Sequence, residues 1–486
     1  MGALLLGYTA WRARVLAFTH DESLTFLFHY SRSAASVLLH ADTANNHLLN
    51  TLAMKLSGAL FGPTPFALRL PNVLAHALYL FASAAWLRTF GRPLVLVVGF
   101  VLLNLNPYLL DFFSLARGYG IALALGMVSL VLLPRALRDG ELRSQAACLA
   151  VAAFGVVANY TLLNWFVALI GVFGVASLAH YYGGPRDGSL GRRLFEQGLL
   201  VVGVSGALAA VVAAPIAQLR EGREFYYGGS DGFWPDTVGS LLGRLSYSQV
   251  DASGALLGVG CLAVLAVVGA AVGAVWAEMR DTGYRALASP LFAALLLLCV
   301  AALSTVVQHH WLGTPYLEGR TALFLFVLFA VLAIYTGPAV GRCPPGRTGD
   351  ALAVAVALVV VVHAGMSLNG RSVLDWRYDA ATADVIDWLE HHPARRAVQL
   401  GVNWHLAPSV VYYRMTRELV WLGVHENADT HHSELPRSGF GGRMDYYYIV
   451  EDDLPSIAHE IAVVRSLEAM NLGTVDIGTP TFYRAP

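Results

Sequence analysis

The sequence is short of charged residues. Asp, Glu, Lys and Arg make up 13% of its 486 residues, whereas a soluble globular domain has about 25%. Lysine is reduced to a single residue, Lys55, and the formal net charge is -1. A chain without excess positive charge has no electrostatic means of attracting nucleic acid. This shortage excludes a nucleic-acid partner and indicates a membrane environment.

Cysteine is also scarce. The four cysteines are Cys148, Cys261, Cys299 and Cys343. The first three lie in apolar runs and the fourth in an arginine-bearing segment, so no pair indicates a disulfide framework or a CxxC metal site. A cleavable signal peptide is missing as well, because Arg12 and Arg14 interrupt the first apolar stretch and no small-residue cleavage site follows. We therefore exclude redox chemistry and expect the first helix to remain as an anchor.

Apolar residues are abundant, at 56% of the chain. A membrane-spanning helix needs about 20 mainly apolar residues, because backbone groups cannot stay unpaired in hydrocarbon. Eleven apolar runs meet this pattern. They lie near residues 2–18, 66–87, 93–109, 116–133, 145–159, 162–180, 197–218, 254–277, 288–307, 321–337 and 350–367. The sequence therefore predicts a mainly α-helical, polytopic membrane bundle of about eleven transmembrane helices.

Arginines mark alternate connections between these spans. They are Arg88, Arg92, Arg135, Arg138, Arg143, Arg186, Arg192, Arg193, Arg280, Arg285, Arg342 and Arg347. Short connections rich in arginine face the cytoplasm. The intervening loops 19–65, 109–115, 219–253 and 308–320 are instead rich in aromatic, acidic and histidine residues. We expect these loops and the tail to face outward.

The tail differs in composition from the rest of the chain. The segments VQLGV, LVWLGV and YYYIV resemble strands and are separated by helix-like or turn-rich stretches. We therefore expect two domains, a transmembrane domain over 1–367 and a small outer α/β domain over 368–486. Within the outer loop 19–65, apolar residues at helical spacing predict an amphipathic helix along the membrane surface.

The first outer loop begins with His20, Asp21 and Glu22, directly after the first span. Adjacent acids at a membrane boundary are costly unless they are solvated or used. One explanation is a solvated helix end, where acids favour the start of a helix. The other is general-base catalysis, with Asp21 accepting a proton from an acceptor hydroxyl and Glu22 orienting the acceptor or helping to bind a metal.

Four motifs follow one another over the first outer loop and the next span. They are Asp21-Glu22, Asn46-His47-Leu48-Leu49, Phe61-Gly62-Pro63 and Arg69-Leu70-Pro71. This order resembles the C-type (GT-C) glycosyltransferases, above all the branch with the protein O-mannosyltransferases and the aminoarabinose transferases of lipid A. The family often has His-Pro-Pro-Leu where this chain has Asn-His-Leu-Leu. The resemblance implies a GT-C fold and makes His47 a contact for substrate or metal.

Two further segments match the family. Asp111 precedes Arg117 and Tyr119 at the outer ends of consecutive spans, and the resemblance implies an auxiliary carboxylate followed by an arginine-tyrosine pair near the active site. Arg117 would then contact a phosphate, although a snorkelling arginine paired with an acid gives the same pattern. Glu318 and Arg320 precede a later span. The resemblance implies that they bind substrate, with the Arg320 guanidinium holding phosphate oxygens bidentately, whereas an interfacial anchor is the alternative.

Metal binding is open at this stage. His20, Asp21 and His47 carry side chains that suit several divalent ions, but no tight motif such as HExxH joins them. The sequence therefore names these residues as metal ligands without requiring a metal cofactor.

The resemblance implies a glycosyltransferase in the plasma membrane of a prokaryote. It would move a hexose or pentose from a polyprenyl-phosphate donor to a hydroxyl of a glycan, lipid or protein acceptor on the extracytoplasmic face. A transporter or flippase of lipid-linked sugars also needs many spans and buried arginines, but such proteins more often show repeats and interrupted helices at the midplane. A non-catalytic partner in cell-envelope assembly is the third possibility, and the retained acids argue against it.

Overall fold

A computed structural model of the chain describes residues 1–40, 43–139, 141–183, 190–247, 254–340, 346–391, 397–426, 444–450, 465–468 and 481–484. Three residues named above, Arg186, Arg342 and Cys343, lie outside these ranges. The described chain forms two compact units. The first comprises Met1–Thr9, Ala34–Leu52 and Pro71–Leu368, and the second comprises Ala10–Ser33, Ala53–Leu70 and Asn369–Pro486. The tail thus shares a unit with two segments from the N-terminal part of the chain.

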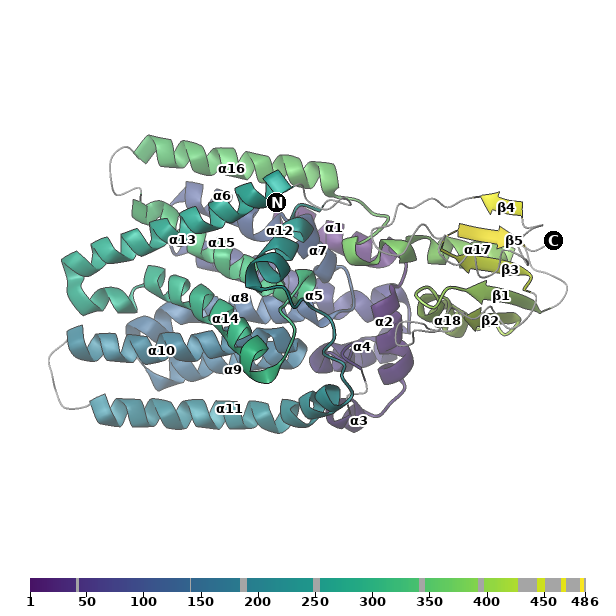
Figure 1. The fold of residues 1–486 in the computed structure, drawn as a ribbon, viewed down its shortest axis with the longest axis horizontal. Helices are drawn as coiled ribbons and strands as arrows, with labels where there is room; N and C mark the ends of the chain where they lie inside the picture. The colour runs from purple at the N-terminus through teal and green to yellow at the C-terminus, as the bar shows by residue number, and fades with distance from the viewer. Residues whose placement is uncertain are drawn as a thin grey trace. The chain divides into compact units, whose positions relative to one another are not determined.

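Long helices dominate the first unit (Figure 1). The helices that lie in it wholly or in part are α1 (Gly2–Val15), α3 (Ala34–Leu39), α4 (Leu48–Phe61), α5 (Pro65–Arg88), α6 (Pro93–Asn104), α7 (Pro107–Phe113), α8 (Gly118–Asp139), α9 (Leu142–Ala158), α10 (Leu163–Gly183), α11 (Leu190–Glu221), α12 (Ser240–Leu245), α13 (Gly254–Thr282), α14 (Pro290–Leu312), α15 (Leu323–Val340) and α16 (Gly346–Ser367). A π-helical turn, η3 (Phe233–Gly239), and short 3-10 turns join some of them, η5 (Gly319–Ala322) among them. The expected mainly α-helical membrane bundle is confirmed.

Fewer than eleven of the described helices meet the length and composition of a membrane span. Among the described residues, eight helices are long and apolar enough to cross a membrane, and α6 with α7 adds a ninth if this pair, bent by 68°, is one span. The bend follows from sequence, because Pro107 starts α7 and the Asn106 side chain caps it by accepting from the backbone N of Tyr108 and Leu109. Helices α1 and α9 have 14 and 17 residues. They are shorter than the roughly 20 residues that a span requires.

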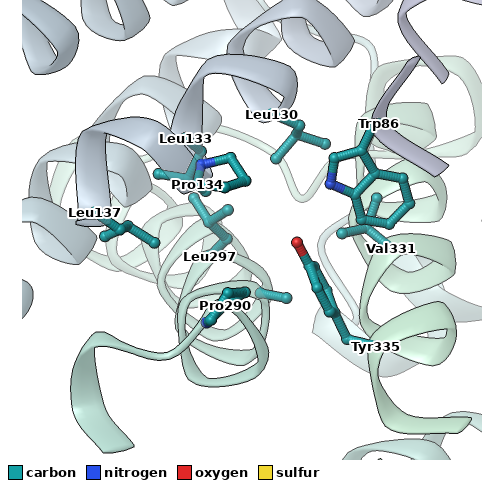
Figure 2. Close-up of a pocket in the computed structure, with 10 residues that line it drawn as sticks. Trp86, Leu130, Leu133, Pro134, Leu137, Pro290, Leu297, Val331 and Tyr335 are labelled. Carbon is teal, nitrogen blue, oxygen red and sulfur yellow. The ribbon is translucent and has the colours of Figure 1, made fainter. Parts of the chain in front are cut away.

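Burial separates inner from outer helices of the bundle. The apolar parts of α5, α8 and α15 are 56% to 67% buried, whereas those of α11, α13 and α16 are only 11% to 17% buried. Their exposed side chains are apolar, as expected of helices that face lipid. A small apolar cavity of about 10 Å³ lies beside α8, α14 and α15, where Trp86, Pro134 and Tyr335 approach each other (Figure 2). It has room for about one water molecule, so it cannot hold an isoprenoid chain.

The second unit contains the expected small α/β domain. Its strands are β1 (Val398–Val402), β2 (Leu422–Glu426), β3 (Tyr446–Ile449), β4 (Arg465–Glu468) and β5 (Thr481–Arg484), in the order β2-β1-β3-β5-β4. Strand β1 is parallel to β2 and β3, and β5 is antiparallel to β3 and β4. Most of β1 is buried, as in a parallel strand covered on both faces. The helical elements of this unit are α2 (His20–Thr25), η1 (Phe26–Tyr30), η6 (Leu374–Ala381), α17 (Thr382–His391) and α18 (Ala407–Thr416).

We expect the substitution Gly120→Ala to destabilise the first unit. A Cβ at this position of α8 would lie 2.6 Å from the carbonyl oxygen of Phe112 and 2.7 Å from Oδ1 of Asn72, and backbone cannot easily move away. Overpacking of this kind costs about 1–3 kcal/mol, so the thermal melting temperature of the purified protein should fall. Gly174→Ala on α10 is the control, because a Cβ there meets nothing within 4 Å. Equal melting temperatures for the two variants would contradict this packing.

Candidate functional site

The acidic motif lies on the short helix α2 of the second unit. Helix α2 begins after Thr19, whose backbone N and hydroxyl both donate to Oε2 of Glu22 at 3.0 Å. This is the reciprocal capping arrangement that a Thr-x-x-Glu sequence favours at a helix start. Local sequence therefore fixes where the helix begins and turns the Glu22 side chain back toward the first residue.

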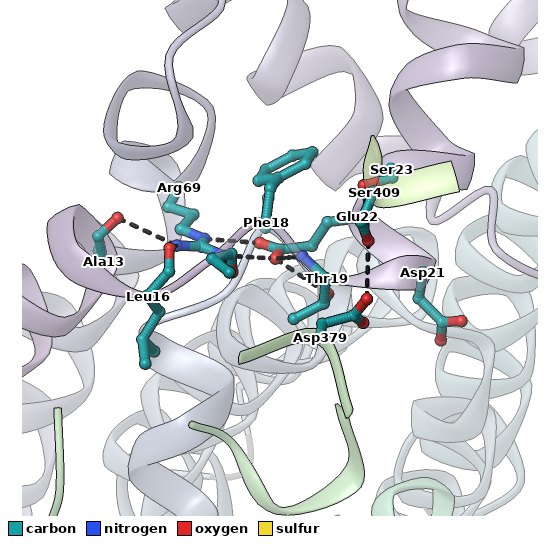
Figure 3. Close-up of polar contacts among 12 residues, drawn as sticks. Ala13, Leu16, Phe18, Thr19, Asp21, Glu22, Ser23, Arg69, Asp379 and Ser409 are labelled. Carbon is teal, nitrogen blue, oxygen red and sulfur yellow. Dashed lines mark hydrogen bonds and ion pairs between the residues drawn. The ribbon is translucent and has the colours of Figure 1, made fainter. Parts of the chain in front are cut away.

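Glu22 also forms a buried ion pair with Arg69 of α5. Its Oε1 and Oε2 accept from Nε and Nη2 of Arg69 at 2.8 and 2.6 Å, and both side chains are fully buried. The remaining donors of Arg69 are bound by the carbonyls of Ala13, Leu16 and Ala17 (Figure 3). A fully hydrogen-bonded, bidentate pair of this kind positions chain segments. These contacts hold the Glu22 carboxylate in place, and its assignment as a catalytic residue stays a prediction.

A third carboxyl group, Asp379 of η6, approaches the same helix. Its Oδ2 accepts from the backbone N of His20 at 2.6 Å, and its Oδ1 accepts from the Ser409 hydroxyl of α18 at 2.9 Å. Burial raises the pKa of Asp379 well above its usual value; the charges of Asp21 and Glu22 act in the same direction, while these two hydrogen bonds oppose the shift. Folding therefore raises the affinity of the Asp379 carboxylate for a proton.

Asp21 lies between these two arrangements along the helix. Its side chain is 7% exposed, and its carboxylate points away from the Glu22–Arg69 pair (Figure 3). The imidazole of His20 contacts the carbonyl of His405 at 2.7 Å, and α18 packs against α2. His20, Asp21 and Glu22 thus lie on one short helix, which contacts Arg69, Asp379, His405 and α18 within the second unit.

The other six sequence-predicted residues lie in the first unit. The ring of His47 lies 5.3 Å from that of Tyr119, and Nη2 of Arg117 donates to Oδ1 of Asn45 at 3.0 Å. Arg117 is only 2% exposed. The absence of a side chain at Gly118 permits this approach, because a Cβ there would collide with the carbonyl of Ala158 and with His47.

Asp111, on α7, accepts from the hydroxyl of Tyr247 through both carboxylate oxygens at 3.0 Å. One turn earlier on α7, the Tyr108 hydroxyl lies close to Gly319, at the start of η5. Through these contacts, α7 approaches the segment that carries Glu318 and Arg320. The structure therefore brings buried polar side chains together from segments that are distant in sequence.

Glu318 and Arg320 lie beside a loop that precedes α12. The Arg320 guanidinium lies over the ring of Tyr227, 4.2 Å from its centroid. Partial burial raises the pKa of Glu318, and Asp236 and Asp231 add to the shift, while the positive charge of Arg244 opposes it. Acidic and cationic groups thus both act on Glu318.

A metal site is not formed by the part of the chain that the structure describes, since no group of three His, Cys, Asp or Glu residues there could hold an ion. The assignment of His20, Asp21 and His47 as metal ligands stays a prediction. His20 already contacts the His405 carbonyl, and His47 lies in the other unit.

Sequence reasoning assigned no site role to four residues of these clusters, Arg69, Arg244, Tyr247 and Asp379, although Arg69 belongs to one of its motifs. Arg69 had a signal, because an arginine inside a predicted span is costly and so marks a special role. Asp379 had none, since its contact with His20 crosses 359 positions. Only the folded chain brings such pairs together.

Asp379 should make stability depend on pH. A carboxyl group whose pKa rises on folding contributes stability that is present below its unfolded pKa of about 3.9 and is lost as the pH rises through the folded value. We expect Asp379→Asn, which is neutral at every pH, to flatten the decline in melting temperature above about pH 4. Thermal melting across pH measures this slope. Asp281→Asn, at an exposed position near the end of α13, should keep it, and equal slopes for wild type and Asp379→Asn would refute the assignment.

Comparisons with known proteins concern structure alone. No protein-family model and no curated protein matches the chain. Among solved structures, it is similar to ArnT from Cupriavidus metallidurans in the apo state, with 11% identity, a TM-score of 0.52, and 99% of this chain and 96% of that chain covered. The same ArnT bound to undecaprenyl phosphate gives 13% identity and a TM-score of 0.49 over the same shares. Arabinosyltransferase EmbB from Mycobacterium smegmatis gives 18% identity and a TM-score of 0.37, over 75% of this chain and 40% of that chain.

The similarity to apo ArnT extends over nearly the whole of both chains. It includes the helical membrane bundle and the small C-terminal domain. The chain has the GT-C fold that the order of its sequence motifs implied.

Proposed function

We propose that the protein is a membrane glycosyltransferase that transfers a sugar from a polyprenyl-phosphate donor to an acceptor hydroxyl, with Asp21 as the general base. The observation that carries this proposal is that the two adjacent carboxylates, Asp21 and Glu22, have different surroundings. Both oxygens of Glu22 accept hydrogen bonds from Arg69 or Thr19, whereas the carboxylate of Asp21 points away from that pair (Figure 3). The GT-C fold supports the same class of reaction.

In the proposed reaction, the acceptor oxygen attacks the anomeric carbon of the sugar as Asp21 takes the hydroxyl proton. The bond between that carbon and the phosphate oxygen breaks, polyprenyl phosphate leaves, and the anomeric configuration inverts. Phosphate is already a good leaving group, so the protein mainly supplies a base, cationic contacts and orientation.

The donor phosphate is assigned to the cationic surface of the first unit. Arg117 and Arg320 hold its oxygens, because guanidinium groups suit bidentate phosphate contacts. Asp111, through its bonds to Tyr247, and Glu318 shape the surroundings of the sugar. His47, just before α4, and Tyr119, on α8, contact the substrate. The acceptor is a hydroxyl of a glycan, a lipid or a protein, and the reaction takes place on the extracytoplasmic face.

Asp21→Asn should abolish transfer and leave donor binding unchanged. The amide keeps the size of the carboxylate but cannot accept the proton, and loss of a general base lowers turnover by roughly 10²–10⁴-fold. The assay offers undecaprenyl-phosphate hexoses and pentoses to purified protein with membrane extract as acceptor, and measures transfer and donor binding separately. Asp281→Asn is the matched control. Retained transfer in Asp21→Asn would remove this residue as the base, and transport of the lipid without any transfer would favour a flippase.

Arg320→Lys should weaken donor binding more than it lowers turnover. Lysine keeps the charge but loses the planar fork of donors, and a hydrogen bond to a charged group contributes about 1.5–3 kcal/mol. We expect the KM for the donor to rise by at least tenfold. Arg220→Lys, near the end of α11, is the control for an exposed arginine. An unchanged KM in Arg320→Lys would mean that this side chain is only an interfacial anchor.

A further inference from the structure

The first unit also contains a polar cavity. It lies at the end of helix α8 that is farther from Arg117. Its volume is about 700 Å³. The residues that line it include Arg138, Glu141, Arg143, His180, Arg193 and Glu196. They come from the end of α8, the start of α9, the end of α10 and the start of α11, which pack against one another. The ends of four helices, α8, α9, α10 and α11, therefore surround the cavity.

The floor of this cavity is a buried polar network. Nε2 of Gln197 donates to Oε1 of Gln145 at 3.1 Å, and the Ser177 hydroxyl donates to Oε1 of Gln197 at 3.0 Å. Both glutamines are more than nine-tenths buried and line the cavity. Burying uncharged amides among apolar helices is costly. An apolar wall would be expected at this position, but the cavity has hydrogen-bonding groups there instead.

The mouth carries more positive than negative charge. Arg138, Arg143 and Arg193 are exposed there. Glu141 and Glu196 also line the cavity, and Glu196 accepts from the neighbouring Arg192 at 2.8 Å. Arginines therefore outnumber glutamates among the lining residues that the structure describes.

The cavity is separate from the proposed donor surface. Arg117 and Arg138 are 21 positions apart at the two ends of α8, which corresponds to roughly 31 Å at 1.5 Å per residue. That distance is about the thickness of the hydrocarbon core. A ligand held at this mouth is consequently at the opposite membrane interface from one held by Arg117.

Size and position restrict the ligand. Cavities of about 300–1,000 Å³ hold small molecules or headgroups, and basic pockets between transmembrane helices bind the headgroups of anionic lipids. Guanidinium groups suit phosphate oxygens, while the amides below suit the hydroxyls of a headgroup. The flanking helix α11 is only 17% buried over its apolar part, so lipid can reach the opening from the side.

We propose that this cavity binds the phosphate group of an anionic membrane lipid. Free inorganic phosphate offers the same chemistry without the acyl chains, so the experiment must separate the two sources. The site does not depend on the proposed transferase reaction.

The test uses the full-length protein in phosphatidylcholine nanodiscs with increasing phosphatidylglycerol, and native mass spectrometry to measure retained phosphatidylglycerol. The double variant Arg143→Gln/Arg193→Gln should lower the apparent affinity for phosphatidylglycerol by about tenfold. Arg220→Gln, which removes the same charge from the other end of α11, should leave it within about twofold. Glu141→Gln, which removes an opposing charge, should raise it.

Unchanged affinity in the double variant would overturn the proposal. Inorganic phosphate that competes as well as phosphatidylglycerol does, at equal concentration, would overturn the lipid assignment and leave a free-phosphate site. If the double variant does not fold, Glu141→Gln decides alone, because a merely structural arginine cluster would not bind lipid more tightly after loss of a glutamate. No gain in that variant would refute the site.

Discussion

A buried ion pair between Glu22 and Arg69 constrains the second unit. Taking both charges out of water costs several kcal/mol per ion, and removing one partner from such a pair costs about 3–5 kcal/mol. Arg69 offsets this cost with a bidentate bond to Glu22 and with three backbone carbonyls from residues 13–17. The end of α1, the start of α2 and the start of α5 are therefore held as one arrangement. A flexible acidic loop would not keep Asp21 in one orientation, whereas this arrangement does.

Asp379 extends the same constraint to the tail. Its carboxyl group joins the first backbone N of α2 to Ser409 of α18, and the Tyr413 hydroxyl of α18 accepts from the backbone N of Phe18 at 2.9 Å. Residues more than 350 positions away thus complete the surroundings of the acidic helix. The small α/β domain consequently helps to hold the acidic motif in place.

Much of this fold could be predicted from the sequence, because spans and strands depend on local patterns. Apolar length identified the helices, and only α1 and α9 proved too short to count as full spans. The acidic helix was foreseeable from its position, since the Thr19 and Glu22 cap is local. The partners of Glu22 and Asp111 were not foreseeable. Arg69 and Tyr247 reach them across 47 and 136 positions, and no periodicity encodes such pairings.

The arginines at the two ends of α8 illustrate the same limit. In the sequence, Arg117 and Arg138 both follow or precede an apolar run, so both fit the description of a snorkelling side chain. A snorkelling arginine buries its aliphatic stem but keeps its charged head in water. Arg138 is exposed and meets this condition. Arg117 is 2% exposed and donates to Asn45, so water does not solvate it freely. The two arginines therefore differ in environment although the sequence around them is alike, because the contact with Asn45 crosses 72 positions.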